Sequence, residues 1–356
     1  MPGGAIALHR GAMTVREGRT APLRVLAPPP PVPGGHAPGM RHPGPLPPQL
    51  RGIGFSRQEA LALGVAEHRL RDADLTSPVG RGVRVPAGCP APLLEAARAL
   101  TRRYPGTVIS HRSAALLHRM RVPACWQGCS ELWLTRADDS RALRRPGVVC
   151  RRGRLGPHEV VRVHGVAVTS PVRTFLDVCA ELTVTEAVVL ADGLVNAHRH
   201  GIRRAVAAVC RPDELETGVR EHAGRRGIRT ARAAVERMRV GSDSPGETRL
   251  RLLLEDHGIR GLVLDHPLLG PDGTLLAQPD LALESHRLSL QYEGAHHDRA
   301  EQRMLDIRRL RATESAGWRE LRICAHDLQR HTTTTRGRVP VAVALVWEAM
   351  GTAHRR

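Results

Sequence analysis

Residues 280–297 read DLALESHRLSLQYEGAHH, and this stretch decides the fold expected for the C-terminal part of the chain. On both sides of the Ser285-His286 pair, apolar residues fall at every second position. That spacing is typical of two β-strands joined by a tight turn. With Ser285-His286 as the turn, Glu284 pairs with Arg287, and Asp280 lies directly opposite Gln291.

This hairpin has one apolar face and one polar face, which carries Asp280, Gln291 and Glu293, with His296 and His297 just beyond. Carboxylate and imidazole groups gathered at one strand end suit a divalent metal site. The alternative is an amphipathic hairpin with a solvated polar face, and taken alone these residues favour it.

The length and composition limit the number of domains and the kinds of partner to be expected. A length of 356 residues predicts two or three domains. The formal net charge is +18, and the chain has no lysine, so every basic side chain except histidine is arginine. Such a charge attracts polyanions, and guanidinium groups suit phosphate. Coding bias towards GC-rich codons is an alternative source of the arginines.

Cysteine usage and hydropathy favour a cytoplasmic protein. The seven cysteines are irregularly spaced, and Cys125 and Cys129 form a lone CxxxC that gives only weak support for zinc. Reduced thiols are therefore expected. No apolar run reaches membrane-spanning length, and Met1 to Arg10 lacks the apolar core of a signal peptide.

The N-terminal part divides into a tail and a small domain. Residues 1–50 are rich in Pro, Gly and Arg and are expected to be disordered. Residues 51–90 predict a winged helix-turn-helix: a capping box at Ser56–Glu59, a second helix over Val65–Leu75, and a basic strand pair over Gly80–Pro86. The nucleic-acid contacts expected there are Arg69, Arg71, Arg81 and Arg84. A small helical cap with an ordinary surface is the alternative.

Residues 91–200 predict a mixed α/β region, with strands at 131–135, 147–151 and 160–168 and a helix capped by Ser170-Pro171. Its His111, Arg112 and His118 lack a nucleophile or a paired acid at a useful spacing, so we expect structural or nucleic-acid-facing roles. Residues 201–241 predict an Arg-rich helical connector with solvated, charged helices.

Residues 242–356 predict a last domain with the order helix, three antiparallel strands, helix, strand, helix. The helices are expected at 248–257, 298–316 and 339–350, and the strands at 262–269, within 274–292 and at 318–324. Together with the preceding regions, this order makes the chain an α+β protein.

Five sequence elements occur in order in this last domain. They are Glu247, Pro279-Asp280, Gln291-Tyr292-Glu293-Gly294 with His297, the pair Asp306 and Arg309, and Gly317–Arg322. With them, residues 242–330 resemble the Vsr-related (very-short-patch-repair endonuclease-like) uncharacterised domain of the PD-(D/E)xK nuclease superfamily. The resemblance implies a restriction-endonuclease-like core.

The upstream half has a second resemblance. Its cap at Phe55 to Pro86, Ser110–Ala115 and Thr169–Thr174 resemble AbiEi-type antitoxin-like proteins of actinobacteria. That resemblance implies an antitoxin-like region at 91–200 and a winged-helix reader, with DNA as the partner.

The nuclease resemblance implies a Mg²⁺ site held by Glu247, Asp280 and Glu293, with Asp280, Gln291, Glu293 and His297 as catalytic residues. Such a metal lowers the pKa of bound water and stabilises the transition state of phosphodiester hydrolysis. His297 would act as general acid or base.

The sequence departs from the family pattern at two points. Where the family commonly has Glu-x-Asp-Gly, this chain has Gln291-x-Glu293-Gly294, so one negative charge is lost. The superfamily lysine is absent, although Vsr-like members use histidine instead. The sequence therefore leaves two functions open: a Mg²⁺-dependent DNA endonuclease, and a non-catalytic DNA-binding regulator. A third, a protein-interaction role with charge set by coding bias, also stays open.

Overall fold

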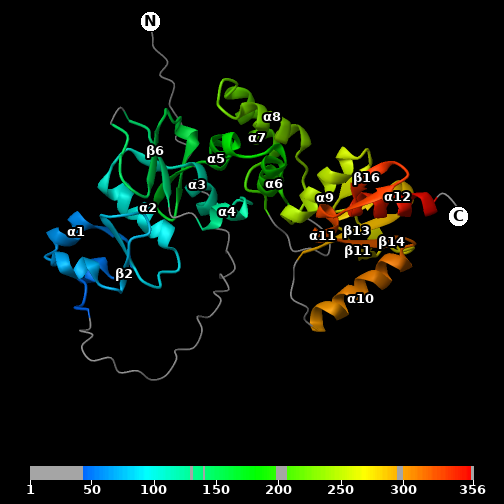
Figure 1. The fold of residues 1–356 in the computed structure, drawn as a ribbon, viewed down its shortest axis with the longest axis horizontal. Coiled ribbons are helices and arrows are strands. Elements are labelled where there is room, and N and C mark those ends of the chain that lie inside the picture. The colour runs from blue at the N-terminus through cyan, green and yellow to red at the C-terminus, as the bar shows by residue number, and fades with distance from the viewer. Residues whose placement is uncertain (1–42, 129–130, 139–140, 198–206, 295–299, 354–356) are drawn as a thin grey trace, which may run out of the picture. The chain divides into compact units, whose positions relative to one another are not determined.

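The computed structural model describes residues 43–128, 131–138, 141–197, 207–294 and 300–353 (Figure 1). These residues form an α+β protein with separate sheets, as the sequence predicts. Most of the expected disordered tail lies outside the described residues. Its last part is an exception, because Leu46 and Leu50 are buried in a small core with Phe55, Ala60 and Leu70. Burial of apolar side chains therefore begins before residue 50.

The first small domain has the strand order β1-β3-β2. Its elements are β1 (Phe55–Ser56), α1 (Arg57–Ala62), the 3₁₀ turn η2 (Glu67–Arg71), β2 (Leu75–Thr76) and β3 (Val83–Pro86), preceded by η1 (Pro48–Leu50). The capping box is confirmed: the Ser56 hydroxyl accepts from the Glu59 N–H, and the Glu59 carboxylate accepts from the Ser56 N–H.

The helix expected over Val65–Leu75 is wrong, because only η2 forms there. The apolar residues Val65, Leu70 and Leu75 recur at intervals of five, which does not match the α-helical period. Val65 and Leu70 nevertheless reach the small core, with Leu75 packed against it.

The loop before β3 is packed tightly against the loop before β6 (Val148–Arg152). Gly80 and Gly147 both have left-handed backbone angles, with φ of +76° and +74°. A Cβ on Gly147 would lie 2.6 Å from the Val79 carbonyl carbon, and a Cβ on Gly80 would collide with the Pro146 carbonyl oxygen. Only glycine allows both the angle and the approach.

The middle region is a five-stranded mixed sheet in the order β6-β5-β4-β8-β7, covered by helices. The strands expected at 131–135, 147–151 and 160–168 are confirmed, and the last one is a hairpin. Ser170 caps α5 by accepting from the Arg173 N–H. The other elements are α2 (Pro92–Arg103), β4 (Thr107–Ile109), α3 (His111–Leu117), α4 (Ala124–Gln127), β5 (Leu132–Arg136), η3 (Pro157–Glu159), β7 (Val160–Val163), β8 (Val166–Thr169), α5 (Pro171–Val178), η4 (Cys179–Glu181) and α6 (Val184–Val195).

The expected solvated connector is instead part of a core. Helices α7 (Pro212–Glu221) and α8 (Ile228–Arg237) bury Leu215, Val219, Ala231 and Ala234 against α5 and α6. The charged residues of these helices are spaced so that an apolar stripe remains, which is the pattern of an amphipathic helix rather than a solvated one.

The C-terminal domain is built on a four-stranded sheet in the order β14-β13-β12-β9. Strands β9 (Leu262–Leu264), β12 (Leu281–Leu283) and β13 (Leu288–Glu293) are antiparallel neighbours, and β14 (Arg319–Cys324) lies parallel to β13. The remaining elements are α9 (Pro245–Asp256), β10 (Leu268–Leu269), β11 (Leu275–Ala277), η5 (Glu284–His286), α10 (Ala300–Ser315), α11 (Ala325–Gln329), β15 (His331–Thr334), β16 (Gly337–Pro340) and α12 (Val341–Ala353).

The predicted hairpin register is confirmed, because Leu281 pairs with Leu290 and Leu283 with Leu288, which places Asp280 opposite Gln291. The expected solvated polar face is wrong except at its end, where Glu293 is exposed. Ala282, Ser289 and Gln291 are all buried. Strands β12 and β13 are the two inner strands of the sheet, and inner strands with both faces covered do not show a polar side to water.

Helix α9 packs against two hydrophobic cores. Leu250 and Leu254 belong to the core of the C-terminal sheet, and Leu252 belongs to the core around α5 and α6. Between them, the fully buried Arg251 pairs with Asp192 of α6 at 2.9 Å. The first turn of α9, which carries Glu247, is thereby fixed to the middle region.

We predict that Gly147→Ala lowers the free energy of unfolding by about 1–3 kcal/mol, since it adds backbone strain and a collision with Val79. Urea denaturation measures this change. The control is Gly165→Ala, because Gly165 has a similar φ of +81° with no atom within 4 Å of a built Cβ. Equal losses in the two variants would show that the contact with Val79 contributes nothing.

Candidate functional site

Glu247 lies in the first turn of α9, beside the C-terminal end of β13. Ser244 caps the helix by accepting from the Glu247 N–H at 3.1 Å. Gly246 has no Cβ, so the Tyr292 ring of β13 packs directly over it. The Glu247 side chain is 6% exposed, and its carboxylate accepts from the Asp243 N–H at 2.7 Å. The expected helix acid is therefore held next to the hairpin.

Asp280 lies just before β12, and its carboxylate accepts from the Tyr292 N–H at 2.8 Å. This bond crosses the hairpin from one strand to the next. The resemblance assigns this side chain to a metal. In the structure it also extends the β12–β13 pairing by one hydrogen bond, just before β12 begins.

Gln291 is buried on β13, with 3% of its surface exposed. Its Nε2 has no hydrogen-bond partner among the described residues, and the same holds for the hydroxyl of Ser289 on the same strand. Leaving such a group unpaired costs about 1–3 kcal/mol. An amide at this position provides no negative charge. The buried polar residues of β13, Ser289 and Gln291, are therefore both neutral.

Glu293 is exposed and points into an ionic cluster rather than into the buried part of the site. Its carboxylate pairs with Arg322 of β14 at 3.0 Å. Arg322 also pairs with Glu320 at 2.9 Å and lies 3.9 Å from Asp306. Partial burial lowers the pKa of Arg322, but the hydrogen bond to Glu320 and the nearby carboxylates outweigh it, so the pKa is raised overall.

The sequence did not identify Arg322 as a site residue. The parallel pairing of β13 with β14 places Arg322 directly beside Gln291. One sequence signal could have found it. Glu320 and Arg322 alternate in a strand that follows a helix, and a strand reached through such a crossover can pair in parallel with the strand before the helix.

The three acids that the resemblance assigns to Mg²⁺ are not gathered into one cluster in the described part of the chain. Magnesium needs carboxylate oxygens that converge on one point. Among the residues that the structure describes, no three His, Cys, Asp or Glu side chains form a group that could hold a metal ion. Glu293 is paired with Arg322, and Gln291 is neutral. His297 lies outside the described residues, as does Cys129 of the CxxxC pair.

The four arginines expected to contact nucleic acid differ in their exposure and in whether they are already paired. Arg69 is buried and pairs with Asp74 at 2.7 Å, and that hydrogen bond raises the pKa of Arg69. Its expected place in a DNA groove is therefore wrong. Arg84 is half-buried and donates to the Leu70 carbonyl at 2.6 Å. Arg71 and Arg81 are exposed, with no ion pair to another described residue.

His118 has the expected structural role. Its Nε2 lies 2.7 Å from the Thr169 carbonyl oxygen, and burial lowers its pKa. His111 and Arg112 lie against Trp133 and are considered below.

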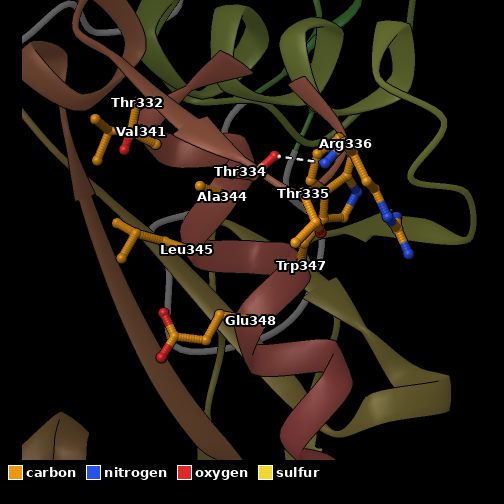
Figure 2. A pocket seen from close by; sticks show the side chains of 9 residues that line it. All are labelled: Thr332, Thr334, Thr335, Arg336, Val341, Ala344, Leu345, Trp347 and Glu348. Carbon is orange, nitrogen blue, oxygen red and sulfur yellow. Dashed lines mark hydrogen bonds between the residues drawn. The ribbon is translucent and has the colours of Figure 1, made fainter. Parts of the chain in front are cut away.

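A separate pocket of about 540 Å³ lies between the β15–β16 hairpin and α12 (Figure 2). Arg336 stacks over the Trp347 ring at 4.8 Å, and Leu345 and Glu348 point from α12 on another side. None of Glu247, Asp280, Gln291 or Glu293 lines this pocket.

No protein-family model matches the sequence. It is similar to two uncharacterised proteins of Mycobacterium tuberculosis, MT2308 of strain CDC 1551 / Oshkosh and Rv2248 of strain ATCC 25618 / H37Rv. Each is 29% identical over 170 residues, which make up 48% of this chain and 59% of the relative. The chain thus spans about six tenths of the length of each relative. No helix in the described part of the chain has the length and apolar character needed to cross a membrane.

We predict that Gln291→Met changes the free energy of unfolding by less than about 1 kcal/mol, because it removes an unpaired buried amide and keeps a similar volume. Chemical denaturation tests this, with Ser289→Ala as the matched change on the same strand. A loss above about 2 kcal/mol for Gln291→Met alone would mean that the amide is bonded in the folded protein.

Proposed function

We propose that this chain is a DNA-binding protein whose restriction-endonuclease-like C-terminal core no longer supports efficient hydrolysis, as in an antitoxin-like transcriptional regulator. One observation carries the proposal: the buried strand position next to Asp280 is the neutral Gln291, and the nearest strand acid, Glu293, is neutralised by Arg322.

The element order of the C-terminal domain supports a nuclease-like core. Helix α9 precedes three antiparallel strands, and α10 leads to a fourth strand parallel to the third. This is the order that the sequence predicts for residues 242–356, with the hairpins β10–β11 and β15–β16 and the short helix α11 inserted. Glu247, Asp280 and Gln291 all lie near the same end of β12 and β13.

Two features support DNA as the partner. The net charge of +18 comes from an excess of arginine over acidic residues, and arginine binds phosphate through paired N–H donors. The small N-terminal part also has a three-stranded sheet, with helix α1 between its first and second strands and with exposed Arg71 and Arg81. These are parts of a winged helix, although the second helix is only η2.

The second candidate is a Mg²⁺-dependent endonuclease. It is favoured by the placement of Glu247 and Asp280, because both are anchored by backbone N–H groups beside β13. In this reading Glu247, Asp280 and Glu293 would hold the metal, and His297 would move a proton. It requires Glu293 to leave Arg322.

We predict that the full chain binds duplex DNA and loses about 100-fold in affinity between 50 and 200 mM salt, as expected for about four phosphate contacts. Fluorescence anisotropy of a labelled duplex over a salt series measures this. An affinity independent of salt would contradict both candidate functions and leave the third, a protein-interaction role.

We further predict that the wild type nicks supercoiled plasmid with Mg²⁺ or Mn²⁺ no faster than Asp280→Ala does. Gln291→Glu restores the missing carboxylate, so it should show metal-dependent nicking above the wild type. The matched control is the Asp280→Ala/Gln291→Glu double variant, which should return to background. Wild-type nicking that Asp280→Ala abolishes would instead establish the endonuclease.

A further inference from the structure

Three basic side chains lie against one indole in the middle region. Trp133 of β5 is 7% exposed, and its Nε1 has no hydrogen-bond partner among the described residues. The guanidinium of Arg112 lies 5.2 Å from the ring centre, and that of Arg151 lies 5.8 Å from it. The His111 ring is 5.5 Å away and tilted by 35°. A buried indole N–H without a partner among the described residues thus lies within a group of basic side chains.

Arg151 is the uncompensated charge of this group. It is exposed on β6, opposite Thr135, and therefore on the same sheet face as Trp133. No described carboxylate pairs with Arg151. Arg112, by contrast, is paired with Glu181 at 2.6 Å. A guanidinium stacked on an indole keeps its N–H edge available for an anion.

His111 is held in a strained conformation at the start of α3. Its φ is +50°, which costs about 1–3 kcal/mol for a residue with a side chain. Its Nδ1 lies 2.9 Å from the Ser110 hydroxyl, which accepts from Thr135. Strain of this kind persists where the surroundings fix a side chain for a task.

Burial lowers the pKa of His111, and Arg151 and Arg225 act in the same direction, while Asp177 and Glu181 oppose them. The lowered pKa favours the neutral imidazole, which has one donor and one acceptor nitrogen. Asp177 does not repel an incoming anion strongly, because Arg173 and Arg225 both pair with it.

We propose that Arg151, His111 and the Nε1 of Trp133 form a binding site for a phosphate group, carried by a nucleic acid or by a free nucleotide. Phosphate supplies the acceptor oxygens that an unpaired guanidinium and an unpaired indole N–H need. The other cations of the cluster are already paired with carboxylates, so Arg151 gives the site its net positive charge.

The test compares Arg151→Gln with Arg211→Gln in the full chain. Arg211 is also exposed, but it pairs with Asp213 at 3.0 Å. Each variant therefore removes one positive charge, from an ion pair at Arg211 and from an arginine without a described carboxylate partner at Arg151. The probes are a labelled DNA duplex, adenosine monophosphate and inorganic phosphate. Anisotropy follows the duplex, and calorimetry follows the two small anions. Thermal melting checks that both variants fold.

Arg151→Gln should weaken binding of at least one probe about tenfold or more, as expected for the loss of a charged hydrogen bond. If the duplex is the ligand, the salt slope should also fall by about 0.9, while Arg211→Gln stays near the wild type. Trp133→Phe, which keeps a ring but removes the N–H, should weaken the same probe. Binding of a small anion without DNA binding would support this site and contradict the proposed function.

Equal binding by Arg151→Gln and Arg211→Gln for every probe would overturn the site. If both variants bind the duplex as the wild type does, DNA binding stands and its contacts lie elsewhere. If the wild type binds none of the three probes, both this site and the proposed function are wrong.

Discussion

A buried ion pair constrains the rest of this structure. Arg251 has no exposed surface, and its guanidinium is neutralised by Asp192 at 2.9 Å and by Glu255 at 3.1 Å. A buried charge is tolerated only while its partners stay in place, and removing one partner typically costs 3–5 kcal/mol. Helices α6 and α9 therefore cannot slide past each other. This ion pair also fixes the position of Glu247 in the candidate site, because Glu247 lies one turn before Arg251 on α9.

The backbone of the C-terminal domain could be predicted well from local patterns. Leucines at every second position and the Ser285-His286 turn specified the pairing of Asp280 with Gln291, and the structure has that register. Capping residues such as Ser56 and Ser170 also marked helix starts correctly. Where apolar residues recurred at an intermediate spacing, as at Val65, Leu70 and Leu75, the local pattern was ambiguous and the predicted helix was wrong.

The surroundings of the site could not be predicted in the same way, because they depend on pairings distant in sequence. Polar Ser289 and Gln291 looked solvent-facing from the local pattern, but both are buried on an inner strand of the four-stranded sheet. Glu293 looked like a metal ligand until the parallel register brought Arg322 to 3.0 Å. Arg69 looked like a DNA contact until Asp74 occupied its guanidinium. For the hairpin residues a partner from another segment decided what the side chain is free to do, whereas for Arg69 the partner lies only five residues further along the chain.

The parallel pairing of β13 with β14 also has a consequence that we expect for folding. Strands β12 and β13 are joined by a tight turn, so they can pair early in folding. Strand β14 can join only after the chain has passed through α10, and such distant contacts form slowly. We therefore expect Gln291 to be open to solvent in the early hairpin and to be enclosed when Glu320 and Arg322 arrive on β14. The rate of that last step should decide how long the chain exposes an unpaired strand edge to other molecules.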